Sequence, residues 1–218
     1  MLLHRVGRTF AHETGIRLAD TPAPLYRLLV LSVLLATRIK AEIAVAAARE
    51  LFAAGCGTPR GMLAATWQDR VDALGRGHYV RYDESAASAL GDGAHLLLGT
   101  YRGDLRRLRA RAGDTDELRR LLCEVPRLGP AGVDIFCREA QQVWPELRPY
   151  LDRKALDGAG KLGLPTDPRA LAKLVSDHDL AILSAALVRV SLRPSIAREL
   201  GPMALGPQSW MGSDGDGR

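Results

Sequence analysis

One stretch of the sequence, EVPRLGPAGVDIF from Glu124, has the residue types that bind an anion through the backbone. Small residues surround Pro130, where an apolar helical pattern begins, so the spacing predicts a tight turn followed by a helix. Amides at a helix N-terminus lack partners within the helix, and the helix dipole adds to their attraction for a phosphate. Pro130 has no N–H, which leaves Gly129, Ala131 and Gly132 as the expected donors. The alternative is a plain turn between two helices.

The overall charge agrees with a phosphate-bearing partner. The 218 residues include 30 Lys and Arg against 25 Asp and Glu, which gives a formal net charge of +5 and a pI of about 9.4. A basic protein of this kind favours nucleic acid as a partner. Most of the basic residues are arginine, a bias typical of GC-rich coding, so the ratio of arginine to lysine carries no functional message.

The composition predicts an all-α fold. Hydrophobic residues make up 47% of the chain and aromatic residues only 5%, and Ala and Leu are abundant. Helical patterns are expected at about 24–37, 41–54, from 59, at 83–98, from 115, at 130–144, from 153, and twice within 168–192. The apolar run at 28–36 is far shorter than the ~20 residues that span a bilayer. We therefore expect a buried helix, no membrane partner, and a disordered Gly/Ser/Asp-rich tail at 206–218.

The cysteines and histidines do not form a recognisable metal site. Cys56, Cys123 and Cys137 are odd in number and contain no C-x-x-C spacing, so they predict neither a zinc site nor a disulfide framework. Free thiols favour a reducing cytoplasm, and the N-terminus has no apolar core typical of a signal peptide. The five histidines are scattered singly. We expect a cytoplasmic protein, associated with the nucleoid in a bacterium.

The hairpin resembles the helix-hairpin-helix motif of the HhH-GPD superfamily of DNA glycosylases, the endonuclease III-like proteins. The family pattern is Leu-Pro-Gly-apolar-Gly, then two variable residues and a small one. Pro126, Leu128, Gly129 and Gly132 match it, whereas Arg127 replaces the first glycine. LYRLLVLSVLLATRIKAEIAVAAARELF, GRGHYVRYDESAASAL and VWPELRPYLDRKAL also resemble family segments in the same order. The resemblance covers residues 25–165.

This resemblance implies two helical lobes with a cleft between them. Residues 25–149 would form the central lobe and end in the helix-hairpin-helix at about 115–144. Residues 1–24 and 150–205 would form the second lobe. The implied partner is double-stranded DNA, bound by a monomer. The residues that the resemblance assigns to DNA binding are Arg127, Leu128, Gly129, Ala131, Gly132, Arg38 and Lys40.

The resemblance also implies a catalytic aspartate after the hairpin. Asp152 matches the family position in order and context, two residues farther from Trp-Pro than the pattern has it. A carboxylate at a helix N-terminus stays ionised and can stabilise an oxocarbenium-like transition state. Asp152 could equally be a plain N-cap of the helix from Arg153. Asp134, four residues before Arg138, is the other candidate.

Other family features are absent or untestable in the sequence. Bifunctional members carry a Schiff-base lysine where this chain has Pro130 and Ala131, so a lyase activity is not expected. No cysteine follows Cys137, which excludes the family's iron-sulfur cluster and leaves no expected cofactor. By position, the main-chain carbonyls of Cys123, Val125 and Leu128 could hold Na⁺ or K⁺ at the hairpin.

Further side chains are candidates for the DNA site. Arg38 falls where the family inserts a side chain into the gap left by a flipped base; a solvated helix end is the plain alternative. The possible base-pocket residues, which could equally belong to the core, are Tyr79, Tyr82 and Trp67. The possible phosphate contacts, which could equally form a solvated helix face, are Arg102, Arg106, Arg107, Arg109 and Arg111.

Three interpretations follow. The first is a monofunctional glycosylase of base-excision repair that hydrolyses the bond to a damaged base, with an alkylated purine as the expected substrate because cationic lesions leave easily. The second is a non-catalytic DNA-binding protein that recognises DNA structure or damage. The third is a helical interaction protein in which PRLGPAG is merely a turn. Salt-dependent duplex binding separates the third from the others.

Overall fold

The structure, a computed structural model, describes residues 2–200 and is all-helical, as the composition predicted. The predicted disordered tail at 206–218 lies outside the described residues. Among residues 2–200, no helix combines the length and the apolar character that crossing a membrane requires. The chain divides into two compact units: a central unit, Phe10–Leu147, and a terminal unit, Met1–Thr9 with Arg148–Arg218.

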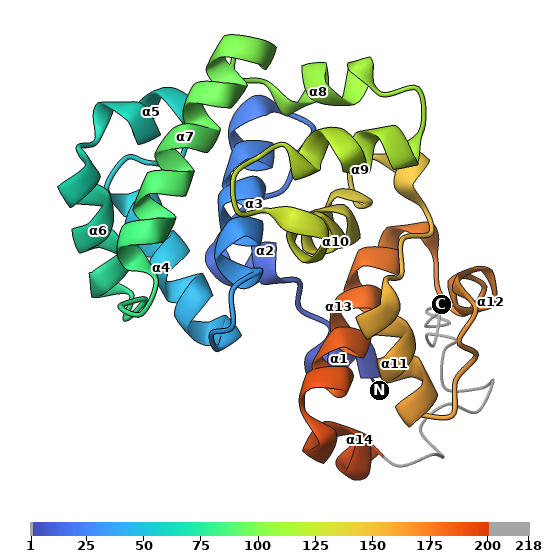
Figure 1. The fold of residues 1–218 in the computed structure, drawn as a ribbon. Coiled ribbons are helices and arrows are strands. Elements are labelled where there is room, and N and C mark those ends of the chain that lie inside the picture. The colour runs from blue at the N-terminus through green and yellow to red at the C-terminus, as the bar shows by residue number, and fades with distance from the viewer. Residues whose placement is uncertain (1, 201–218) are drawn as a thin grey trace, which may run out of the picture. The chain divides into compact units, whose positions relative to one another are not determined.

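The central unit is built around one buried helix. Helix α3 is apolar on nearly all sides and packs against α4, α7, α8 and α10 (Figure 1). A helix without a polar face is stable only where neighbours cover it on every side. The helices of this unit are α2 (Phe10–Thr14), α3 (Pro22–Leu35), α4 (Ala41–Ala53), α5 (Pro59–Ala64), α6 (Trp67–Arg76), α7 (Asp83–Tyr101), α8 (Leu105–Arg111), α9 (Thr115–Cys123), α10 (Gly129–Ala140) and the 3₁₀ turn η1 (Pro145–Leu147).

Local capping explains the helix boundaries. Thr58 accepts a hydrogen bond from the amide of Gly61 and caps α5, which begins at residue 59 as predicted. The sequence pattern ran through Thr66 without a break, but Thr66 and Asp69 form a capping box that starts α6 as a separate helix. Helix α7 ends three residues later than predicted, where Arg102 adopts a left-handed φ of 55°.

The structure corrects the predicted place of residues 10–24. They belong to the central unit, not with the C-terminal helices. The buried Glu139 carboxylate of α10 accepts hydrogen bonds from the amides of Phe10 (2.6 Å) and Ala11 (2.7 Å). Asp20 in turn accepts a hydrogen bond from Trp144 Nε1 (2.9 Å). These contacts join positions more than 120 residues apart, which no local sequence pattern encodes.

The terminal unit has its own apolar core. Its helices are α1 (Leu2–Val6), α11 (Arg153–Lys161), α12 (Pro168–Ala172), the 3₁₀ turn η2 (Asp177–Asp179), α13 (Leu180–Leu192) and α14 (Pro194–Leu200). Helices α11 and α13 cross closely, because a Cβ added at Gly158 would lie 1.9 Å from the carbonyl oxygen of Leu187. Leu183, Leu187 and Val190 of α13 are fully buried in this core.

Candidate nucleic-acid interface

The turn between α9 and α10 leaves backbone amides available at its tip. The amide of Leu128 donates to Val125 O (3.1 Å), and the amide of Gly132 donates to Leu128 O (2.9 Å). Gly132, predicted as an anion donor, is therefore used inside the helix. Within residues 2–200, the amides of Gly129 and Ala131 have no acceptor, and Ala131 is exposed. These two amides are the donors that an anion can reach at the start of α10.

Two residues of the turn have left-handed backbone conformations. Gly129 has a φ of 55° and Arg127 a φ of 61°. Glycine adopts this conformation without strain, whereas for a residue with a Cβ, such as Arg127, it is less stable by about 1 kcal/mol. The backbone at Arg127 therefore has the conformation that favours glycine, the residue that the family pattern has at this position.

The side chain of Leu128 anchors the tip. It is buried, and its Cδ1 would lie 2.8 Å from a Cβ added at Gly132. The same added Cβ would lie 3.3 Å from the Cβ of Ala36, at the end of α3. Gly132 therefore permits a close contact between the N-terminus of α10 and the C-terminus of α3.

That contact places the hairpin beside the turn that contains Arg38 and Lys40. The buried Tyr79 stabilises this turn: its hydroxyl lies 3.2 Å from Leu34 O and 2.7 Å from Thr37 Oγ1. Burial raises the pKa of Tyr79, so this hydroxyl keeps its proton. Arg38 and Lys40 are exposed, and neither forms an ion pair with any residue from 2 to 200.

A third cation completes this surface. The guanidinium of Arg81 lies 5.2 Å from the ring centroid of Tyr82, and the guanidinium of Arg127 lies 5.9 Å from the same centroid. Arg81 is exposed and has no ion-pair partner in the described part of the chain. We call Arg38, Lys40 and Arg81, with the amides of Gly129 and Ala131, the hairpin face. Arg81 stands outside every basic run of the sequence, so no local pattern pointed to it.

The predicted aromatic residues have different environments. Tyr79 is completely buried and belongs to the core, whereas Tyr82 is half-buried. Trp67 is 41% exposed, and its Nε1 donates to Ser88 Oγ (3.0 Å). With Tyr82 and Val80 it borders an open depression of about 550 Å³ beside the start of α7.

The predicted cation site consists of main-chain carbonyls, two of which already accept a hydrogen bond. Val125 O and Leu128 O each accept one hydrogen bond within the turn. A carbonyl oxygen has two lone pairs, so each could still coordinate a cation. No group of three or more His, Cys, Asp or Glu side chains suited to a metal occurs within residues 2–200. Coordination of Na⁺ or K⁺ by Cys123, Val125 and Leu128 remains a prediction.

The two candidate aspartates have different structural tasks. Asp152 lies in the terminal unit as the N-cap of α11, and its Oδ1 accepts a hydrogen bond from the amide of Ala155 (3.1 Å). Asp134 forms an ion pair with Arg119 at 2.6 Å, which joins α10 to α9. Asp134 is thereby a structural link of the hairpin.

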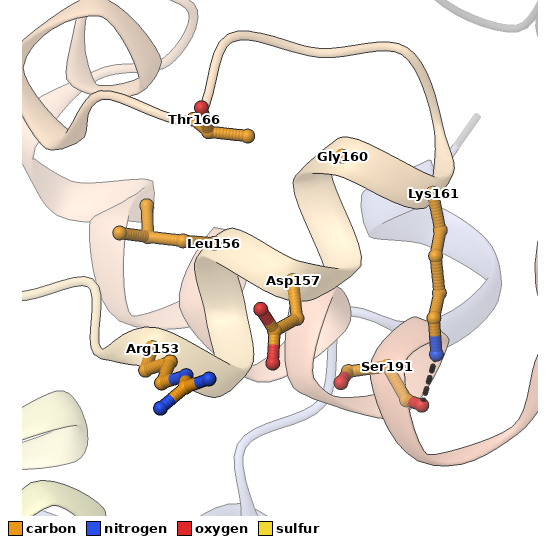
Figure 2. A pocket seen from close by; sticks show the side chains of 7 residues that line it. All are labelled: Arg153, Leu156, Asp157, Gly160, Lys161, Thr166 and Ser191. Carbon is orange, nitrogen blue, oxygen red and sulfur yellow. Dashed lines mark hydrogen bonds between the residues drawn. The ribbon is translucent and has the colours of Figure 1, made fainter.

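A depression of about 640 Å³ lies along α11 in the terminal unit (Figure 2). It is lined by Arg153, Leu156, Asp157, Gly160, Lys161, Thr166 and Ser191. Lys161 Nζ donates to the carbonyl of Ser191 (2.7 Å), so this cation is already engaged. Asp152 is not among the residues that line it.

Much of the arginine-rich segment is engaged within the protein. Arg106 Nη2 lies 2.7 Å from Asp104 Oδ2. Arg109 pairs with Asp20 (3.2 Å) and Glu146 (3.4 Å) and stacks on the Trp144 ring at 5.0 Å. Arg111 lies over the ring of Tyr101 at 5.6 Å. Arg102 and Arg107 are exposed.

The fold is similar to that of a known DNA-binding enzyme. A solved structure of a non-covalent endonuclease III–DNA complex matches with 15% sequence identity and a TM-score of 0.50, covering 78% of this chain and 73% of that one. A trapped covalent endonuclease III–DNA intermediate matches with 15% identity and a TM-score of 0.46, over 73% of this chain and 70% of that one. No family model and no curated protein matches the sequence. The chain therefore has an all-helical fold similar to that of endonuclease III.

Proposed function

We propose that this protein binds double-stranded DNA through the hairpin face. The observation that carries the proposal is the combination of two free amides at the start of α10 with three exposed cations that have no ion-pair partner within residues 2–200. Amides of this kind hold a phosphate in place, and lysine and arginine side chains release counterions from the neighbouring phosphates. The similar fold of endonuclease III, solved in complexes with DNA, supports the same partner.

We further propose that the bound DNA is a substrate. The chemistry would be hydrolysis of the N-glycosidic bond of a damaged base turned out of the duplex, with an alkylated purine as the leaving group. The carboxylate of Asp152, at the N-terminus of α11, would stabilise the cationic sugar that forms as the base departs. Water would then attack that sugar. Pro130 and Ala131 supply no amine, so no Schiff base and no lyase step are expected.

A second function, DNA binding without catalysis, is favoured by one observation. Asp152 already has a structural task, because its Oδ1 caps α11. A plain cap explains this aspartate without any chemistry. In that case the hairpin face alone would account for the activity of the protein.

The experiment that decides between them is a base-excision assay on duplexes that each carry one lesion, followed by alkali to cleave abasic sites. The variants are Asp152→Asn and, as a matched control, Asp167→Asn, because Asp167 caps α12 through the amide of Ala170 in the same way (2.8 Å). Asparagine is a good N-cap, so both variants should fold. Cleavage lost only in Asp152→Asn establishes the glycosylase and its substrate.

Cleavage that survives in Asp152→Asn removes this residue from the mechanism. If no lesion is cleaved, although the duplex is bound in a salt-dependent way, the protein binds DNA without catalysis. No binding at low salt contradicts both functions.

A further inference from the structure

Arg127 is held at the hairpin tip by the start of another helix. Its Nη1 donates a hydrogen bond to Ser85 Oγ, and its guanidinium lies 5.9 Å from the ring centroid of Tyr82. Both partners come from the first residues of α7 or the position just before them. The tip of the α9–α10 turn is thus tied to α7 by a side chain in place of the glycine of the family pattern.

Ser85 is oriented to receive this hydrogen bond. Its hydroxyl proton is donated to Tyr82 O (3.1 Å), which leaves the oxygen lone pairs for the guanidinium. We call Arg127, Ser85 and Tyr82 the clasp. Ser88, one turn farther along α7, has the same arrangement without contact to the hairpin: it donates to Glu84 O (3.0 Å) and accepts from Trp67 Nε1 (3.0 Å).

Arg81 is the second guanidinium at the same tyrosine. It lies 5.2 Å from the Tyr82 centroid, so two like charges lie within 6 Å of one ring. Neither arginine forms an ion pair with any described residue. Because both cations lie close to one ring, an anion that binds beside the ring would be attracted to both of them. Arg127 donates to Ser85 Oγ, whereas Arg81 donates no hydrogen bond to any residue from 2 to 200.

We propose that the clasp positions the hairpin tip and that Arg81, not Arg127, is the arginine that contacts a DNA phosphate on this side of the hairpin face. Arg127 acts through Ser85 and Tyr82, as a positioning residue for the amides of Gly129 and Ala131. This inference rests on the proposed DNA-binding function for the role of Arg81, while the clasp can be tested without DNA.

The clasp is tested in the full-length protein by hydrogen exchange of the Leu128 amide, which closes the turn by donating to Val125 O. The variants are Arg127→Met, Ser85→Ala and the two combined; methionine keeps the left-handed Cβ and removes the guanidinium. Each single change should accelerate exchange about tenfold, and the double change should add little, because both remove one interaction. Ser88→Ala should leave the exchange rate unchanged.

The roles of the two arginines are separated by the salt dependence of binding to an undamaged duplex. Arg81→Gln should lower the slope of log affinity against log salt by about 0.9, the value of one phosphate contact. Arg127→Met and Ser85→Ala should each weaken binding roughly fivefold with an unchanged slope, since each would loosen the tip without removing a phosphate contact. Arg60→Gln, on α5 at the opposite end of α7, is the charge-matched control.

Three results would overturn the proposal. Additive effects of Arg127→Met and Ser85→Ala on exchange contradict the clasp. If Arg127→Met lowers the slope of log affinity against log salt and Arg81→Gln does not, Arg127 is the arginine that contacts the phosphate, and the proposed roles are wrong. If the protein binds no duplex, the proposed function and the role of Arg81 both fail, and the exchange measurements still decide whether the clasp exists.

Discussion

The protein has two basic regions, and they differ in what their charges do. In the arginine-rich region of α8, Arg106 and Arg109 neutralise Asp104, Asp20 and Glu146, and so hold the central unit together. On the hairpin face, Arg38 and Lys40 lie outside the arginine-rich run, are exposed, and are unpaired within residues 2–200. A dense run of arginines therefore marks stability here, and scattered cations mark the proposed interface. Neutralised and free charges can be distinguished only when the partners are known.

The difference between the two regions is tested most directly by removing two positive charges from each region in turn. Arg38→Gln with Lys40→Gln should weaken duplex binding about 100-fold at 0.1 M salt, near 2.7 kcal/mol, because each phosphate contact contributes about tenfold there. The slope of log affinity against log salt should fall by about 1.8. Fluorescence anisotropy with a labelled duplex, measured from 50 to 300 mM salt, gives both quantities.

The matched variant removes the same net charge from α8, as Arg106→Gln with Arg109→Gln. Its slope should equal that of the wild type when measured well below its melting temperature. If the two double variants lose affinity equally, the difference between the regions is only one of net charge, and the hairpin face has no special role.

The second prediction concerns stability. Arg109→Gln should lower the free energy of unfolding by about 1–2 kcal/mol, since it removes two ion pairs and a stacking contact with Trp144. Arg107→Gln, on the same helix and exposed, should change it by less than about 0.5 kcal/mol. Urea unfolding followed by circular dichroism measures both, and equal midpoints for the two variants would show that the Arg109 contacts contribute nothing.

These two regions also show what the sequence could and could not predict. Caps are local: Thr58 and Asp152 stand directly before the helices that they begin, and the cap of α9 could be narrowed by sequence to Asp114 or Thr115, of which the structure has Asp114. The apolar run of α3 predicted a central buried helix, which is confirmed. Both depend only on neighbours in sequence or on hydrophobicity.

The pairings that decide the role of each arginine are long-range. Asp20 and Arg109 are 89 residues apart, and Ser85 and Arg127 are 42 residues apart. No periodicity relates such positions, so the arginine-rich run made Arg109 a candidate phosphate contact, whereas Arg81 carried no local signal. The contacts of residues 10–24 are also long-range, with α10 and Trp144, whereas the resemblance implied a place with the C-terminal helices. The role assigned to Asp152 by resemblance stays a prediction.

The third prediction concerns the close contact between α10 and α3 that supports the hairpin face. Gly132→Ala places a Cβ 2.8 Å from Leu128 Cδ1 and 3.3 Å from Ala36 Cβ, so the Leu128 side chain must shift and the ends of α10 and α3 must separate slightly. The gain in helix propensity should offset part of the strain and leave a net loss of about 1 kcal/mol in stability, with a severalfold loss of duplex affinity. In Gly99→Ala, where nothing lies within 4 Å of the added Cβ, stability should instead rise by about 0.5–1 kcal/mol. A Gly132→Ala protein with wild-type affinity would show that the contact with α3 is not needed for binding.

The smallest predicted effect is a pH dependence of stability, which is expected for the α8 region and not for the hairpin face. The Arg106 guanidinium holds the pKa of Asp104 below its usual value of about 3.9. A carboxyl group with a lowered pKa in the folded state stabilises the protein above its unfolded pKa, and this contribution is lost as pH falls through the folded pKa. Because the pair is partly exposed, the contribution should be under about 1 kcal/mol. Asp104→Asn, which keeps the cap of α8, should therefore lower stability slightly at pH 7 and make no difference near pH 2.

The hairpin face has no carboxylate paired with its cations in the described chain, so the corresponding dependence should be absent there. Stability curves from pH 2 to 7 for wild type and Asp104→Asn test the first half of the contrast. Duplex affinity of the wild type from pH 5 to 8 at constant salt tests the second, because arginine and lysine stay charged throughout this range. An affinity that changes steeply in that window would mean that a titrating group has been overlooked at the interface, and the contrast between neutralised and free charges would have to be redrawn around it.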